Sequence, residues 1–210
     1  MLSILIADDH SVVREGLKLI LTELEDSITI AEANNGQEVL DRIRQSRFDI
    51  VLLDISMPGQ NGLEILKQIK DEKPETSVLI LNMHPEDQYA LRSLKAGASG
   101  YLTKESAPQE LIQAIQRIAA GRKYITPSLA EKLAYDFDKD YEKPPHEFLS
   151  DREFQVMRLL ALGKTVKEIG DELFLSIKTV STYRSRILEK MKLNNNAEII
   201  HYAIRNNLID

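Results

Sequence analysis

The sequence predicts a doubly wound α/β domain with a five-stranded parallel sheet, followed by a smaller, all-α domain. Short apolar runs alternate with amphipathic stretches as far as about residue 120, a pattern typical of parallel strands joined by helices. A charged, proline-containing stretch then interrupts the alternation, and beyond it apolar residues recur only at helical spacing. The 210 residues, of which 43% are hydrophobic, are enough for two modest cores.

Five apolar runs in the first domain end at turn-forming or polar residues, which predicts buried strands. They are Ser3–Ala7, Ile28–Ala33, Ile50–Leu53, Val78–Leu81 and Gly100–Leu102. The amphipathic stretches predict the helices Ser11–Leu24, Gly36–Arg44, Gly62–Glu72, Asp87–Ala96 and Ala107–Ala120. Right-handed crossovers would place these helices on both faces of the sheet. We predict the flavodoxin-like strand order 2-1-3-4-5, which puts the first and third strands side by side.

Residues 136–148 combine many charges with Pro144 and Pro145, so they are predicted to form an exposed linker and not a helix. A short helix around Ser128–Tyr135 is expected before them. The predicted organisation is therefore a first domain over residues 1–122, a linker with this helix over 123–148, and a second domain over 149–210.

The second domain opens with a capping box, in which Ser150 and Glu153 satisfy opposing backbone donors. A helix is expected from Asp151 to Leu162. Two further helices are predicted: Val166, Ile169 and Leu173 lie on one face of the first, and the second is expected to bury Val180, Ile187 and Met191. Gly170 costs the first of them up to about 1 kcal/mol relative to alanine, and a small residue there would allow the two helices to cross closely.

A last helix is predicted over Ala197–Asn207. Its apolar residues are Ile199, Ile200, Ala203 and Ile204, and Leu208 follows. Core packing would account for part of this stripe, and a dimer contact for the rest.

Three carboxylates are expected to meet at one edge of the sheet. Asp54 ends the apolar run FDIVLLD, and Asp8 and Asp9 end ILIADD. Ligands gather at the carboxyl ends of parallel strands, and repulsion among three carboxylates calls for a cation, for which Mg2+ is suited. The alternative is that each aspartate only caps a following helix. The number of carboxylates, together with the later Lys104, favours a metal-assisted phosphoryl site.

Charge is divided unevenly along the chain. Residues 1–148 carry 17 Lys and Arg against 25 Asp and Glu, a net charge of −8, whereas residues 149–210 carry 10 against 8, or +2. Within 176–192 five basic residues face Glu189 alone. This basic stripe indicates nucleic-acid binding, although a solvated helix face would carry the same charges. The chain has no cysteine, which excludes disulfides and favours a cytoplasmic location, and no segment is apolar enough for a membrane span.

The segments ILIADDH, FDIVLLDISMPGQNGLE and GASGYLTKES resemble the first, third and last strands of the receiver domains of bacterial two-component response regulators. The resemblance implies that Asp54 accepts phosphate, that Mg2+ is bound by Asp8, Asp9, Asp54 and the backbone carbonyl of Ser56, and that Lys104 pairs with a phosphoryl oxygen. It also implies a switch in which Tyr101 rearranges. The family usually has a Ser or Thr where this chain has Asn82, whose amide can still donate but is bulkier than a hydroxyl.

Residues from about 149 to 210 resemble a LuxR-type helix-turn-helix, through LSDREFQVMRLLALGKTVKEIGDELFLSIKTVSTYRSRILEKMKL. The pairing of both modules is that of the NarL/FixJ family. The resemblance implies that the second helix enters the major groove. Base-facing positions would be Ser181, Thr182 and Ser185, while Lys178, Thr179, Arg184 and the backbone near Thr165 and Val166 would hold phosphates. The family often has lysine at the position of Ser181.

We therefore expect a DNA-binding response regulator and not an enzyme. A sensor histidine kinase would phosphorylate Asp54 and so control dimerisation and DNA binding, with RNA polymerase as a further partner. Two alternatives stay open. A metal-dependent phosphohydrolase with an aspartyl-phosphate intermediate would need a second catalytic acid, which is absent two residues after Asp54. A phosphorylation-independent transcription factor with an atypical receiver is supported by Asn82.

Overall fold

The computed structural model describes residues 1–24, 28–57, 61–83, 86–131 and 144–209. The chain divides into two compact units, Met1–Asp138 and Lys139–Asp210, each with its own core. The division falls inside the stretch predicted to be a linker. In the part of the chain that the structure describes, no helix is both long and apolar enough to cross a membrane.

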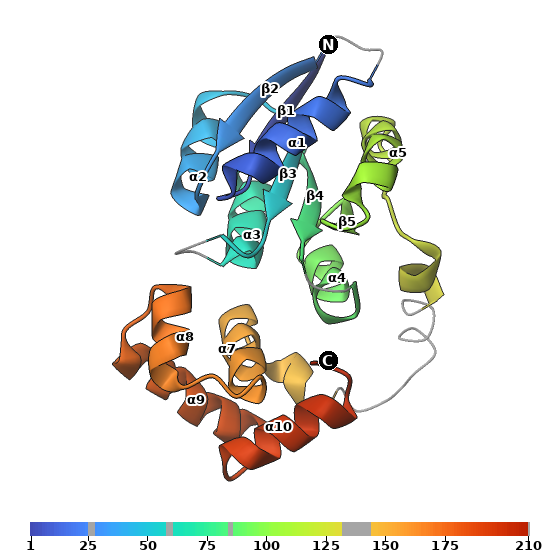
Figure 1. Ribbon diagram of the computed structural model, residues 1–210. Helices are drawn as coiled ribbons and strands as arrows, with labels where there is room; N and C mark the ends of the chain where they lie inside the picture. Colours follow the sequence, from blue (N-terminus) through green and yellow to red (C-terminus); the bar gives the residue numbers. More distant parts are fainter. Residues whose placement is uncertain (25–27, 58–60, 84–85, 132–143, 210) are drawn as a thin grey trace. The chain divides into compact units, whose positions relative to one another are not determined.

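The first unit is a five-stranded parallel sheet in the order β2-β1-β3-β4-β5, as predicted (Figure 1). The strands are β1 (Leu2–Ala7), β2 (Ile28–Ala33), β3 (Ile50–Asp54), β4 (Ser77–Asn82) and β5 (Gly100–Thr103). Ala7 on β1 pairs with Leu53 on β3. The next residues of these strands, Asp8 and Asp54, therefore leave the sheet at the same edge.

Helices flank this sheet on both faces (Figure 1). They are α1 (Ser11–Leu21), α2 (Gly36–Gln45), α3 (Gly62–Glu72), α4 (Glu86–Lys95) and α5 (Ala107–Ala119). Alternate strand residues such as Ile4 and Leu52 share one core cluster with α1 and α5. Helix α1 is one turn shorter than predicted. At its end the Thr22 hydroxyl donates to the Leu19 carbonyl at 2.6 Å, which satisfies a carbonyl of the last turn.

The first unit extends beyond residue 122, where the sequence placed the start of the linker. Tyr124 forms a parallel bridge with Gly100 and is 6% exposed. Its hydroxyl donates to Glu110 at 2.5 Å. A Cβ on Gly100 would lie 2.8 Å from the Tyr124 carbonyl oxygen, so glycine is required where this segment lies beside β5. Residues 127–131 are helical, and the remainder of the helix predicted at Ser128–Tyr135 lies outside the described residues.

The second unit is all-helical, as predicted. Its elements are η1 (Pro145–Phe148), α7 (Asp151–Ala161), α8 (Val166–Leu173), α9 (Ile177–Met191) and α10 (Asn196–Arg205). The capping box of Ser150 and Glu153 is present. The prediction that residues 145–148 belong to an exposed linker differs from the structure, in which they form a 3-10 helix. Proline suits the first position of a helical turn, and His146 Nδ1 lies 2.8 Å from the Tyr202 hydroxyl of α10.

Gly170 of α8 lies against the turn that follows this helix. A Cβ on Gly170 would lie 2.8 Å from the Leu175 carbonyl oxygen, so glycine accommodates the backbone of the turn after α8, not a close crossing of helices.

On α10, Ile199 and Ala203 are buried, whereas Ile204 is 58% exposed. Core packing therefore explains only part of the apolar stripe on α10, as expected.

Candidate functional site

The predicted carboxylates lie together at the carboxyl edge of the sheet, and we call Asp8, Asp9 and Asp54 the acidic cluster. Asp8 and Asp54 are each only 1% exposed. Lys104, which follows β5, reaches across the edge. Its Nζ lies 2.6 Å from Asp8 Oδ2 and 2.7 Å from Asp54 Oδ2. One ammonium group thus bridges the two buried carboxylates.

Burial and charge act in opposite directions on these groups. Burial and the neighbouring Asp8 raise the pKa of Asp54, although Lys104 and the Ser56 N–H oppose the rise. Burial lowers the pKa of Lys104, but the two carboxylates outweigh burial and leave that pKa raised. Burial thus disfavours the charged form of Asp54, and Lys104 partly offsets this effect.

The donor set fits a divalent cation. Asp9 Oδ1 is a buried carboxylate oxygen with no hydrogen-bond donor among the described residues, and Asp8 Oδ2 faces the Lys104 ammonium group, 2.6 Å away. Ligand atoms of Asp8, Asp9, His10 and Asp54 all lie within 4.8 Å of one another. Buried carboxylates without donors are costly, and oxygen ligands at this density suit a hard cation.

The backbone around the acidic cluster is held by specific contacts. The Ser56 N–H donates to Asp54 Oδ1 at 2.8 Å, and the His10 N–H donates to Asp8 Oδ1 at 2.8 Å. Arg14 donates from Nη1 to the Asp8 carbonyl at 2.8 Å and from Nε to Glu32 at 2.8 Å. The end of β1 is therefore fixed by α1 and β2 at the point where the carboxylates emerge.

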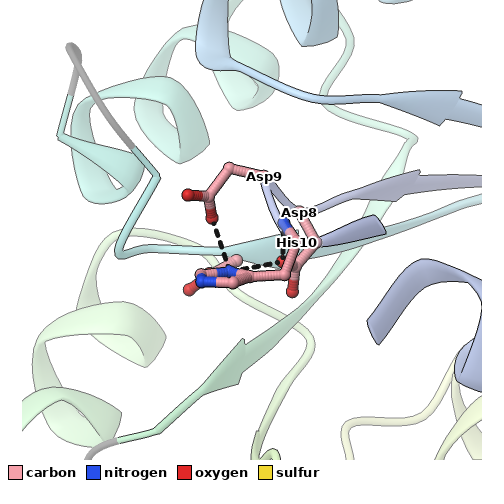
Figure 2. A group of neighbouring side chains, drawn as sticks. Asp8, Asp9 and His10 are labelled. Carbon is pink, nitrogen blue, oxygen red and sulfur yellow. Dashed lines mark hydrogen bonds and ion pairs between the residues drawn. The ribbon is translucent and has the colours of Figure 1, made fainter. Parts of the chain in front are cut away.

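Sequence reasoning did not identify His10 as part of this site. Figure 2 shows its imidazole directed toward both neighbouring aspartates, with Nδ1 2.9 Å from Asp9 Oδ1 and 3.3 Å from Asp8 Oδ1. The only available signal was its position directly after the acidic pair. A position in sequence does not determine where an exposed ring points, so the contact required the structure.

Asn82 is the centre of a second group of contacts beside the acidic cluster. Its Oδ1 accepts from the Ser56 hydroxyl and from the Met83 N–H, both at 2.9 Å. Its Nδ2 donates to the Tyr101 hydroxyl at 3.4 Å. Asn82 and Tyr101 are both fully buried. The three residues predicted to act as the switch, Asn82, Tyr101 and Lys104, are thus close neighbours, and the Ser56 hydroxyl is an additional member that the sequence analysis missed.

On the second unit, the residues predicted to face bases form an exposed surface of α9. Ser181, Thr182 and Ser185 are exposed. The hydroxyl of Thr182 donates to the Lys178 carbonyl at 2.9 Å, and that of Ser185 donates to the Ser181 carbonyl at 3.1 Å. Because these hydroxyl protons are directed to the backbone, the oxygens present acceptor lone pairs outward.

The predicted phosphate-binding residues differ in their exposure to solvent. Lys178 is exposed, whereas Arg184 is half-buried and donates from Nε to Asn196 Oδ1 at 2.6 Å. Thr179 is half-buried, and its N–H donates to the Ser176 hydroxyl at 3.1 Å. The structure therefore holds Arg184 and Thr179 in place and leaves Lys178 exposed.

Near the start of α8, Thr165 caps the helix in a second capping box. Its N–H donates to Glu168 at 2.7 Å, so this donor is occupied by a carboxylate, and Val166 follows as the first residue of α8. Lys190, which contributes to the basic stripe in the sequence, donates to the buried Glu153 at 2.6 Å. Its charge is therefore largely neutralised within the fold.

Known proteins are similar to this chain over its whole length. Residues 4–116 match the response regulator receiver domain, and residues 147–203 match the bacterial regulatory proteins of the luxR family. The chain is 36% identical to the response regulator GacA of Pseudomonas aeruginosa over 211 residues, covering 100% of this chain and 99% of GacA. It is 35% identical to the response regulator UvrY of Escherichia coli over 209 residues, covering 99% and 96% of the two chains.

Solved structures with a similar fold include DNA complexes. RcsB from Salmonella enterica serovar Typhimurium, bound to promoter rprA in the presence of the phosphomimetic BeF3−, aligns with a TM-score of 0.66 and 26% identity, covering 96% of this chain and 98% of that chain. A further RcsB–DNA complex aligns with a TM-score of 0.60 and 26% identity, covering 100% of this chain and 99% of that chain.

Proposed function

The chain belongs to the NarL/FixJ family of two-component response regulators, and we propose that phosphorylation of its Asp54 controls dimerisation and DNA binding. It is a DNA-binding regulator of transcription with a receiver domain and a LuxR-type helix-turn-helix. The observation that carries the proposal is the buried Asp54 carboxylate, whose Oδ2 lies 2.7 Å from Lys104 Nζ. A phosphoryl group on that oxygen would add roughly 1.5 to 2 negative charges beside the Lys104 ammonium group.

The divalent ion in this proposal is Mg2+. Asp8, Asp9, Asp54 and the carbonyl of Ser56 would hold it, and the oxygen-rich donor set of the acidic cluster supports this assignment. When bound, the ion would neutralise charge and align the carboxylate with an incoming phosphoryl group. Lys104 would pair with a phosphoryl oxygen, and the Ser56 N–H would continue to orient Asp54.

The proposed partners follow from this chemistry. A sensor histidine kinase would supply the phosphoryl group, double-stranded DNA would bind α9, and two copies of the chain would pair on the DNA. RNA polymerase is a further proposed partner. We also propose a cytoplasmic location, because that is where bacterial chromosomal DNA lies.

In the proposed DNA complex α9 lies in the major groove. The exposed hydroxyls of Ser181, Thr182 and Ser185 would contact base edges. Phosphates would be held by the residues Lys178, Thr179 and Arg184 and by the backbone at Thr165 and Val166. Within this set Lys178 is the most accessible cation, and Arg184 is preoriented by Asn196.

The test is phosphorylation of the full chain by a small phosphodonor with Mg2+, followed by intact-mass measurement. The wild type should gain the mass of one phosphoryl group, and Asp54→Asn should gain none. Asp71→Asn is a matched control, because Asp71 is an exposed carboxylate on α3. An Asp54→Asn variant that still gains the full mass would contradict the assignment.

A second candidate is a transcription factor whose receiver does not respond to phosphate. One observation favours it, since the buried Asn82 side chain is already engaged by Ser56, Met83 and Tyr101. The same phosphorylated samples distinguish the candidates. Phosphorylation should tighten operator binding under the first proposal and leave it unchanged under the second.

A further inference from the structure

Ile177 is an apolar side chain on the otherwise polar exposed surface of α9. It is the first residue of the helix and is 57% exposed. Within α9, all of which the structure describes, no other large apolar side chain is exposed. Single exposed apolar residues are common on protein surfaces, so the exposure of Ile177 gains meaning only from its place on the helix.

Ile177 lies in line with residues that are proposed to contact bases. Ser181 and Ser185 follow it at intervals of four residues, so the three side chains lie one above another on the same side of α9. All three are exposed. In a helix-turn-helix, the N-terminal residues of the second helix contact the base edges. Ile177 therefore continues the proposed base-facing surface by one turn, toward the end of α9 that lies deepest in the groove.

The turn before α9 fixes the backbone at Ile177. The Ser176 hydroxyl oxygen accepts from the Thr179 N–H at 3.1 Å and lies 2.8 Å from the Thr179 hydroxyl. The Leu175 N–H donates to the Gly170 carbonyl at 2.8 Å, which ties the turn to α8. Isoleucine is also stiff at χ1, because it branches at Cβ. A contact made by Ile177 thus costs little additional conformational entropy.

The chemistry of the major groove limits what an isoleucine can recognise there. Adenine, guanine and cytosine present hydrogen-bond donors and acceptors on their edges, whereas thymine adds a C5-methyl group. Isoleucine has no side-chain donor or acceptor, so the methyl group of thymine is the feature of a base edge that it can distinguish.

We propose that Ile177 reads a thymine in each half-site of the operator by contact with the C5-methyl group. The inference rests on the proposed function, because it adds a residue to the base-facing surface of α9. Ile177 supplies the apolar part of sequence recognition, and the hydroxyls of Ser181, Thr182 and Ser185 supply the hydrogen bonds.

The experiment uses the full-length chain and duplexes that the wild type selects from a pool of random sequence. Each thymine of a selected duplex is replaced in turn by deoxyuridine, which lacks only the C5-methyl group. Titrations at one salt concentration give the affinity for each duplex, and the ratio of the thymine to the deoxyuridine affinity is the methyl penalty. The chains compared are the wild type, Ile177→Ala and Ile204→Ala.

Ile204 on α10 is the matched control, because it is an isoleucine of nearly the same exposure, 58%. The methyl penalty compares two duplexes with one variant, so a change that affects both duplexes equally, such as weaker dimerisation, leaves it unaltered. Circular dichroism checks that both variants fold.

At one thymine of each half-site, deoxyuridine should weaken wild-type binding about fourfold, the effect of leaving one methyl group unburied. Ile204→Ala should show the same penalty. Ile177→Ala should bind the thymine duplex more weakly than the wild type and show no penalty at that position. Penalties at other thymines should be the same in all three chains.

Three outcomes would overturn the inference. If Ile177→Ala keeps the wild-type penalty at every thymine, Ile177 contacts no methyl group, and the base-facing role of the α9 hydroxyls stands. If the selected half-sites contain no thymine with a penalty, the chain reads no methyl group. If the wild type binds selected and scrambled duplexes equally, the sequence recognition of the proposed function fails together with the inference.

Discussion

At the scale of single residues, we expect the contacts of Asn82 to influence how the first unit responds to a phosphoryl group. Its amide accepts from Ser56 and Met83 and donates to the buried Tyr101 hydroxyl. A modification shifts an equilibrium only by its differential interaction with the two states. An asparagine whose amide oxygen and nitrogen are already hydrogen-bonded before phosphorylation has less to gain from new phosphoryl oxygens than a hydroxyl would have.

We therefore predict that Asn82→Thr increases the difference in operator affinity between phosphorylated and unphosphorylated chain. Threonine is too short to keep the 3.4 Å contact with Tyr101, and its hydroxyl is available to a phosphoryl oxygen. Operator titrations with both forms measure the difference, and the wild type is the reference. An unchanged or smaller difference would mean that asparagine already transmits the signal.

The buried Asp54 carboxylate should lower the stability of the folded chain when no divalent ion is bound. Burial raises its pKa above the ordinary 3.8, so at neutral pH the charged carboxylate is less favourable in the folded than in the unfolded chain. Asp54→Asn removes this penalty, while Lys104 keeps Asp8 as a partner. With a chelator present, the variant should melt a few degrees higher than the wild type, the shift expected from about 1 kcal/mol in a unit of this size.

Mg2+ should reverse the order of the two melting temperatures, so that the wild type melts higher than Asp54→Asn. Binding to the folded state alone raises the melting temperature by mass action, and Asp54→Asn removes one of the ligands. Calorimetric melts with and without Mg2+ give both comparisons, with Asp71→Asn as the control for an exposed carboxylate. A variant that melts lower than the wild type in chelator would show that the ion pair with Lys104 outweighs the cost of burial.

At the scale of elements, the start of α7 is tied to α9 through one carboxylate. Glu153 closes the capping box with Ser150 and accepts from Lys190 at 2.6 Å. Burial alone would raise the pKa of Glu153, but the bonds from Lys190 and Ser150 outweigh it and hold that pKa below the ordinary 4.5. The carboxylate is therefore more stable ionised in the folded chain than in the unfolded one.

The lowered pKa of Glu153 makes the stability of the second unit depend on pH. A lowered folded pKa contributes stability that is fully present above about pH 5 and is lost as the pH falls below 4.5. We predict that Glu153→Gln lowers the stability of the second unit by about 1 kcal/mol at neutral pH. The loss should shrink toward pH 4. Melts from pH 4 to 7 test this, with the exposed Glu189→Gln as control. A loss that stays constant with pH would exclude the ionised carboxylate as its cause.

Elements with local signals were predictable from the sequence, and those fixed by distant contacts were not. The capping box at Ser150 and the apolar runs that end at Asp8 and Asp54 gave the right helices, strands and strand order. Tyr124 was assigned to the linker because its bridge to Gly100 joins residues far apart in the chain. The same limit applies to the site. Strand ends bring the carboxylates to one edge, but the directions of the His10 ring and the Ser56 hydroxyl depend on side-chain conformations.

At the scale of the whole molecule, charge separates the two functions of the chain. Residues 1–148 carry a net charge of −8, which suits a unit that binds a cation, and residues 149–210 carry +2. Within the second unit the structure reduces the basic stripe further, since Lys190 is paired with Glu153. Electrostatic attraction to DNA is therefore concentrated on a few side chains of α9, which makes their roles separable by experiment.

The last prediction separates residues that position the DNA from residues that read it. Lys178→Ala and Arg184→Ala should weaken binding to every sequence and reduce the salt dependence by about 0.9 log units for each phosphate that is no longer neutralised. Arg184 is held by Asn196, so its removal should have the larger effect. The hydroxyls of Ser181 and Thr182 carry no charge. Their alanine variants should change base preference by roughly 1–3 kcal/mol for each hydrogen bond to a base that is removed, and leave the salt slope unchanged.

Titrations of these four variants against specific and scrambled duplexes at several salt concentrations measure both quantities. The operator should contain two symmetric half-sites with centres about one helical turn apart, because a dimer presents its two recognition helices to successive major grooves. Moving the half-sites apart by half a turn should therefore abolish cooperative binding. If instead Thr182→Ala alters only the salt slope, or Arg184→Ala alters only base preference, a different face of α9 enters the groove.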